Sequence, residues 1–208
     1  MVANTHAVTI SLVATDTMTV EANIAVGDSP VQGAVDPDAR YAYVSLAGDS
    51  AVAKVDLEER TVVKTVNVSA APVELHLTPD GSTLISADQG SEDEPGESVS
   101  VIDVDTMTVT TTIPTGSGPH CVVIDPSGTR AWVTNLYDDT VSVLDLTTRT
   151  AVATIDVGAL PNGISFSARR SVYSSDAVVD VPDYSGEAPE SHDDGAAHTG
   201  DEDMDEHG

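Results

Sequence analysis

The sequence pattern most informative about the fold spans residues 119–158, which read PHCVVIDPSGTRAWVTNLYDDTVSVLDLTTRTAVATIDVG. The stretch opens on a proline and carries an Asp-Pro-Ser-Gly turn at residues 125–128. Proline presets the backbone angle at the second position of such a turn, and glycine suits the corner that follows. The segments around the turn are rich in valine and threonine, which favour strands. The stretch is therefore expected to form four short β-strands joined by turns.

This unit recurs along the chain. Its opening proline is found at Pro30, Pro72, Pro119 and Pro161, at steps of 42, 47 and 42 residues, and the longer step reflects an insertion over residues 89–97. Four strands in roughly 40–45 residues are typical of a β-propeller blade. A single blade cannot bury both faces of its sheet, whereas blades stacked around an axis can. We predict an all-β protein, a β-propeller of about four four-stranded antiparallel blades, either a closed small ring or a partial propeller.

The two ends of the repeated region bear on whether the blades close into a ring. We expect blades near residues 6–29, 30–71, 72–118 and 119–160, a partial unit at 161–182, and an acidic disordered tail at 183–208. The N-terminal part supplies two last strands (8–13 and 17–26), and the C-terminal part supplies a first strand (162–167) and a second (171–181). The N-terminal and C-terminal strands could pair to form one blade, which would cover both exposed sheet edges. The alternatives are an arc completed by another copy and a fragment of a longer propeller.

Several segments of this unit resemble a known repeat. Trp132-Val133-Thr134-Asn135 is similar to the Tyr-Val-Thr-Asn tetrad of the YVTN β-propeller repeats, and the segments 118–120, 125–128 and 141–145 also match that repeat. The resemblance covers residues 8–167, and residues 43–46 and 85–88 depart from the tetrad. It implies a seven-bladed fold in typical members, which are often surface-layer or secreted proteins. Relatives include sugar lactonases and the haem-binding half of a nitrite reductase, so the resemblance implies no single activity.

The charge of the chain excludes several classes of partner. There are 35 Asp and Glu residues against 8 Lys and Arg residues, which gives a formal charge of −27. Such a surface repels phosphate backbones and anionic lipids, so we expect no nucleic acid partner. No apolar run is long enough for a membrane span, and the first residues do not form a signal peptide, so the compartment stays unassigned. Concentrated salt would screen this self-repulsion, which predicts a halophilic protein.

The candidate metal ligands lie on two predicted inner strands. His120 directly follows Pro119 at the start of one, and Glu74 and His76 lie in the preceding blade. Together with Cys121 they would offer the imidazole and thiolate ligands that suit zinc or copper. The alternative is structural, because strand alternation sends neighbouring side chains to opposite faces and a single cysteine more often behaves as a small buried hydrophobe. A divalent metal is the only cofactor that the sequence suggests.

Two further groups of polar residues call for an interpretation. Asp56, Asp103 and Asp145 recur once per blade, and we expect their carboxylates to cap backbone amides of each blade's own turn. The tail carries His192, His198 and His207 without regular ligand spacing, and the two interpretations are weak binding of divalent metals and a tail that is only solvated. The acidic inserted loop lacks the alternating aspartates of a calcium loop, so we expect a solvated loop there.

No catalytic motif is recognisable in the sequence: there is no nucleophile elbow, phosphate-binding loop or HExxH pair. The sequence therefore favours a non-enzymatic β-propeller binding module, a scaffold for a protein or cell-surface partner, with self-association to complete a propeller as one form of partnership. The other interpretation is a metal- or cofactor-binding or lactonase-like enzyme at the axial mouth, built on His76 and His120.

Overall fold

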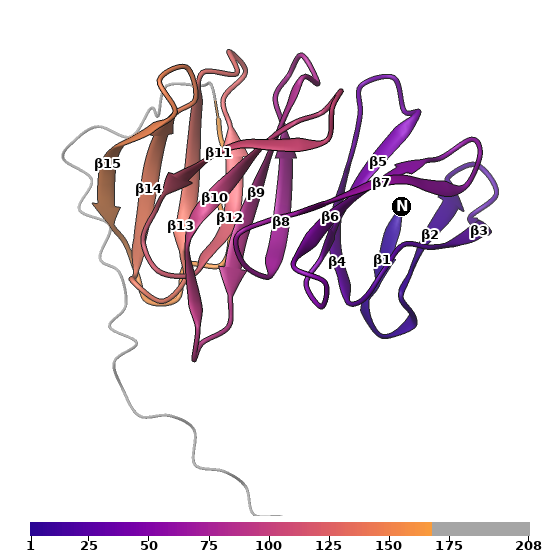
Figure 1. Cartoon of the computed structure of the whole chain (residues 1–208), viewed down its shortest axis with the longest axis horizontal. Helices are drawn as coiled ribbons and strands as arrows, with labels where there is room; N and C mark the ends of the chain where they lie inside the picture. Colours follow the sequence, from indigo (N-terminus) through magenta and orange to yellow (C-terminus); the bar gives the residue numbers. More distant parts are fainter. Residues whose placement is uncertain (168–208) are drawn as a thin grey trace, which may run out of the picture. The chain divides into compact units, whose positions relative to one another are not determined.

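The structure is a computed structural model that describes residues 1–167. The described chain forms four antiparallel sheets, three of four strands and one of three, and its only helical element is the short 3-10 turn Thr5–Ala7. Figure 1 shows the sheets side by side in chain order. The predicted all-β propeller fold is confirmed, and we number its blades 1 to 4 from the N-terminus.

Each blade is a simple up-and-down sheet. Blade 1 contains β1 (Val2–Asn4), β2 (Thr9–Ala14) and β3 (Thr19–Ala25). Blade 2 contains β4 (Pro30–Val35), β5 (Tyr41–Leu46), β6 (Ala51–Asp56) and β7 (Thr61–Asn67). Blade 3 contains β8 (Pro72–Leu77), β9 (Thr83–Gly90), β10 (Pro95–Asp103) and β11 (Thr108–Pro114). Blade 4 contains β12 (Pro119–Ile124), β13 (Arg130–Asn135), β14 (Thr140–Asp145) and β15 (Thr150–Asp156). The insertion near residue 90 lengthens the β9–β10 hairpin.

The blades share details that the sequence pattern only partly reveals. The pairing of the last two strands shifts by one residue at the same place in every blade, as a β-bulge does. The turn before the last strand always holds a non-glycine residue with a left-handed backbone, at Met18, Arg60, Met107 and Arg149. The repeated turn therefore has one conformation in all four blades, although its residues differ.

The two ends of the described chain depart from expectation. Blade 1 has three strands rather than two, because β1 pairs with β2 through Val2–Ser11 and Asn4–Thr9. A three-residue strand is too short to show alternation, so the sequence pattern did not predict it. Residues 162–167 form no strand, which corrects the predicted first strand there. The predicted strand at 171–181 and the tail at 183–208 lie outside the described residues.

The core lies between the sheets rather than within one of them. Ile10 and Ile24 of blade 1 pack on the β5–β6 face of blade 2. Tyr43 and Val52 of blade 2 pack on blade 3, and a third cluster joins blades 3 and 4. Blades 1 and 4 stand at opposite ends of this row in Figure 1. Within the described residues, the four blades therefore form an open arc.

Candidate functional site

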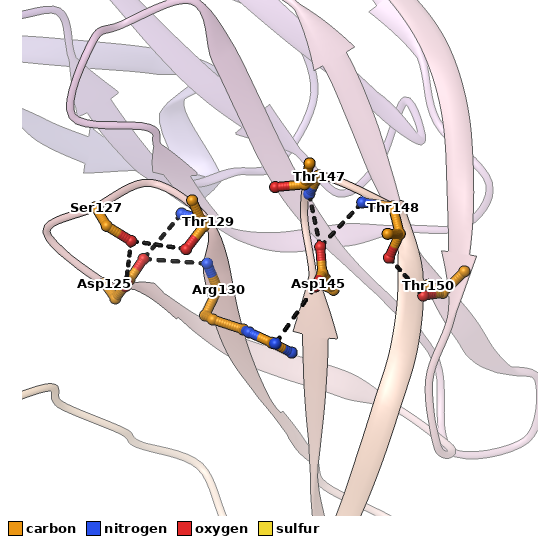
Figure 2. A network of polar contacts seen from close by, with 8 residues as sticks. All are labelled: Asp125, Ser127, Thr129, Arg130, Asp145, Thr147, Thr148 and Thr150. Atoms are coloured by element: carbon orange, nitrogen blue, oxygen red, sulfur yellow. Dashed lines mark hydrogen bonds and ion pairs between the residues drawn. The ribbon is translucent and has the colours of Figure 1, made fainter.

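The recurring aspartates hold turns, as Figure 2 shows for blade 4. The Asp145 carboxylate accepts hydrogen bonds from the backbone amides of Thr147 and Thr148, both at 2.9 Å. Its other oxygen lies 3.4 Å from the Arg130 guanidinium. The Thr148 amide is the main reason why the pKa of Asp145 lies below its usual value. Asp125, at the preceding turn, accepts from the amides of Thr129 and Arg130 at 3.0 Å each.

The same arrangement recurs in the two preceding blades. Asp56 accepts from the amides of Glu58 and Glu59 at 3.0 and 2.9 Å, and Asp103 accepts from the amide of Thr106 at 2.8 Å. The expectation that these carboxylates cap the turns of their own blades is confirmed. Each one acts in a separate turn, so the three do not converge on a common site.

The chemistry-bearing residues of the inner strands lie on β8 and β12. His120 on β12 places its Nδ1 atom 2.6 Å from Oε1 of Gln89, at the end of β9. The Gln89 amide in turn donates to the hydroxyl of Tyr137 at 3.0 Å. Because the Gln89 oxygen can only accept, Nδ1 of His120 carries the proton and Nε2 keeps its lone pair. Burial lowers the pKa of His120, while the Glu74 charge raises it by a smaller amount.

Gly118 allows Tyr137 to reach this position. Gly118 has a positive φ of 64°, and a Cβ atom added to it would lie 2.3 Å from the Tyr137 ring. Any other residue would be strained in this backbone conformation and would push the ring away. The glycine before Pro119, visible in the sequence, therefore supports the Gln89–Tyr137 contact on His120.

Glu74 and Cys121 face each other across the boundary between blades 3 and 4. Burial and the Glu74 carboxylate together raise the pKa of the Cys121 thiol to about 12. The thiol donates to the backbone carbonyl of Asn162 at 3.0 Å. Cys121 is half-buried and protonated, and it acts as a weak hydrogen-bond donor rather than as a thiolate ligand.

His76 has a different neighbour from His120. Its Nδ1 donates to the backbone carbonyl of Val122 at 3.1 Å, which ties β8 to β12. His76 and Glu74 also line an open groove of about 510 Å³ between β4 and β8. Gln32 lines the same groove and accepts from the amide of Leu75 at 3.0 Å. The inner strands are therefore joined to one another by side chains that reach across from blade to blade.

The predicted metal ligands do not all have the same neighbours. Glu74 influences both His120 and Cys121, whereas His76 is held by a backbone carbonyl. Within residues 1–167, no group of three or more His, Cys, Asp or Glu side chains is placed to hold a metal ion. A metal at Glu74, His76 and His120 therefore stays a prediction, and His192, His198 and His207 lie outside the described residues.

Sequence reasoning missed the two partners of His120. Tyr137 directly follows the repeat tetrad and its Leu136 neighbour, and Gln89 is the first residue of the insertion. The insertion itself was visible as a longer step between prolines. Its contact with the next blade was not, because that contact depends on how blades 3 and 4 are packed.

Comparison with known proteins places this fold among the β-propellers. A family model described as a YNCE-like β-propeller matches residues 91–169. Hydrazine synthase of Kuenenia stuttgartiensis is similar in structure, with a TM-score of 0.69 and 26% identity over 73% of this chain and 44% of that one. The dihydro-haem d1 dehydrogenase NirN, solved in complex with DHE, has a TM-score of 0.58 at 14% identity, over 71% of this chain and 33% of that one. No curated protein matches in sequence.

The chain is thus a β-propeller protein, and the family model and the likeness to hydrazine synthase support a YVTN-like propeller family, as the tetrad predicted. It spans less than half the length of both solved structures. The likeness to NirN shows the fold alone. Among the described residues, no helix is long and apolar enough to cross a membrane.

Proposed function

We propose that this chain is a non-enzymatic β-propeller binding module of a halophile, a scaffold whose loops meet a protein or cell-surface partner. The observation that carries the proposal is the use of the recurring carboxylates. Asp56, Asp103 and Asp145 each bind the backbone of their own turn, so in blades 2, 3 and 4 the repeated acid holds the shape of the loop. A rigid, repeated and strongly acidic surface suits recognition of an extended partner.

The experiment is affinity capture with the full chain in about 2 M KCl, which screens the surface charge. The captured partner is then purified and titrated against the chain. We expect saturable binding that survives His120→Ala, because the binding surface is assigned to loops rather than to the axial residues. Binding that disappears with His120→Ala, or the absence of any saturable partner, would contradict the proposal.

A second candidate function is supported by one specific observation. Nδ1 of His120 is occupied by Gln89, and burial favours the neutral imidazole, so Nε2 offers a lone pair near Glu74. This favours an axial ligand site for a metal or cofactor. The experiment is a zinc titration of the full chain, of His120→Ala, and of a control in which His192, His198 and His207 are all changed to Ala. One-to-one binding lost only in His120→Ala supports the axial site, and binding lost only in the control assigns the metal to the tail.

A further inference from the structure

The pentapeptide Asp-Thr-Met-Thr-Val occurs twice in the chain, at residues 16–20 and 105–109. Both copies form the same turn, with a left-handed backbone at Met18 and at Met107. Met107 is 2% exposed and packs between blades 2 and 3. Met18 is 79% exposed and Val20 is 58% exposed. The same five residues are therefore covered by a neighbouring blade in blade 3 and uncovered in blade 1.

The face around Met18 continues onto β2. Val13 pairs with Val20, as Ile102 pairs with Val109 in blade 3. Ile102 is fully buried against blade 2, whereas Val13 is 37% exposed. We call Val13, Met18 and Val20 the leading face of blade 1. The equivalent face of blade 3 is covered by blade 2, and the equivalent face of blade 2 is covered by blade 1.

The covering face is largely apolar in both blades. In blade 2 it includes Tyr43, Val52 and Val66, and in blade 3 it includes Ile85, Val101 and Ile113. We call this the trailing face of a blade.

Blade 4 has a trailing face that no described blade covers. Strand register places Trp132 and Val143 opposite each other, as Ile85 and Val101 are in blade 3. Ile155 pairs with Val141, as Ile113 pairs with Val99, and Ile155 is 47% exposed. Phe166 packs on Trp132 with ring centroids 5.1 Å apart and enlarges the same apolar face.

The interface between blades 2 and 3 contains lysine contacts that the trailing face of blade 4 lacks. Between blades 2 and 3, Lys64 and Lys54 donate to the backbone carbonyls of Thr106 and Val104, at 2.6 and 3.1 Å. Lys54 pairs with Lys64, and the corresponding pair in blade 4 is Val143 and Ala153. The trailing face of blade 4 therefore carries no lysine at these positions and is more apolar than that of blade 2.

We propose that the trailing face of blade 4 packs on the leading face of blade 1 of a second copy of this chain. Blades 1 and 4 of one chain lie at opposite ends of its row, with blades 2 and 3 between them (Figure 1). Two copies joined head to tail make two equal contacts and close into a ring with twofold symmetry. The inference goes beyond the proposed function, because it concerns contact between copies and not a different partner.

Salt is expected to control this association. Each copy carries a formal charge of −27, so two copies repel each other in dilute buffer. At 1 M salt the Debye length falls to about 3 Å, which removes the repulsion and leaves the apolar faces to attract.

The test is the absolute mass of the full chain by light scattering in about 2 M KCl. We expect twice the chain mass of 21.5 kDa. Met18→Glu and Ile155→Glu are each expected to give the single-chain mass, because each puts a charge into both contacts. Val63→Glu is the matched control, since Val63 is 56% exposed on the last strand of blade 2, away from both faces. It should leave the mass doubled.

Mixing the two charged variants makes the test specific. The Met18→Glu copy keeps an intact trailing face and the Ile155→Glu copy keeps an intact leading face, so the mixture should form a heterodimer through one contact. Circular dichroism checks that each variant is folded. A single-chain mass for the unaltered protein, a dimer that neither substitution dissociates, or a mixture that stays monomeric overturns the proposal.

Discussion

Leu46 and Asn135 occupy the same position in two blades, at the end of the second strand and opposite the opening proline. Asn135 donates to Thr140 at 2.8 Å and to Ser142 at 2.9 Å. In blade 2 the two partners are replaced by Ala51 and Ala53, and all three side chains are buried. The position therefore accepts either a polar triad or an apolar one, as long as its members change together.

Leu46→Asn is expected to destabilise the fold by about 3 kcal/mol, because it removes apolar burial and buries an amide without partners. Adding Ala51→Thr and Ala53→Ser in the same chain should recover about 1–2 kcal/mol by restoring the partners. Denaturant unfolding in concentrated KCl measures both effects. The control is the pair Ala51→Thr and Ala53→Ser with Leu46 retained. If the three changes simply add, the triads are not coupled.

Asp88 holds the same position in blade 3, fully buried and bonded to the hydroxyls of Ser86 and Ser100 at 2.7 and 2.6 Å. Burial raises its pKa, so folding favours its protonated form. This group therefore stabilises the fold fully below the ordinary pKa of aspartate, and that stability is lost as the pH rises through the raised value.

Asp88→Asn is expected to raise stability at neutral pH and to flatten this part of the pH profile, because it removes a buried carboxylate and asparagine already occupies this position in blade 1 (Asn4) and blade 4 (Asn135). Thermal unfolding of both proteins across the acid range tests this. The exposed Asp156→Asn change removes the same charge and should leave the profile unchanged. A variant less stable than the parent at pH 7 would show that the hydrogen bonds on the carboxylate, from the hydroxyls of Ser86 and Ser100 and from the amide and hydroxyl of Ser69, outweigh its burial.

Asp145→Asn tests the turn carboxylates. It weakens the hydrogen bonds to the amides of Thr147 and Thr148 and removes the ion pair with Arg130, so we expect a lower melting temperature at pH 7. The pKa of Asp145 is lowered, so its contribution is present above the ordinary aspartate value and is lost as the pH falls through the lowered one. The two proteins should converge in acid. Asp156→Asn again serves as the charge-matched control, and an unchanged melting temperature at pH 7 would contradict the capping role.

Cys121 is the single cysteine, so thiol reagents report on it alone. With a pKa of about 12, only about one thiol in ten thousand is ionised at pH 8, and reaction should be slow. Glu74→Gln removes the nearby negative charge and should lower this pKa, with about tenfold faster reaction for each unit. Glu58→Gln, at a distant turn, should not change the rate. A fast reaction in the unaltered protein would contradict the described contact.

His120 is expected to titrate below its usual pKa of 6.5, with the proton of the neutral ring on Nδ1. Because the lowered pKa disfavours the charged form in the fold, His120 stabilises the fold above 6.5, and this is lost as the pH falls through the lowered value. Glu74→Gln should lower the pKa further, and Gln89→Leu should abolish the preference for Nδ1. Heteronuclear NMR of the ring nitrogens measures both. A His120 that titrates above 6.5, or that mixes both tautomers, would contradict the assignment.

Sequence reasoning predicted much of the fold from a few elements. The prolines at a fixed period, the Asp-Pro turns and the alternating valines identified four-stranded blades, because local turn chemistry and strand period depend on neighbouring residues only. The same reasoning identified the role of Asp145, whose carboxylate binds amides two and three residues along the chain. The candidate site was predicted less well, since Gln89 and Tyr137 reach His120 from other strands.

The blade, its turns and the acidic surface could be predicted from the sequence alone, because each of these depends on the composition and spacing of short segments. Tertiary contacts were needed to show that Val2–Asn4 forms the strand β1 of blade 1, and that residues 162–167 form no strand. The tertiary structure also leaves Met18 exposed and buries Met107, although the two lie in identical pentapeptides. Packing between blades acts over long sequence separations, and identical local sequences meet different neighbours there.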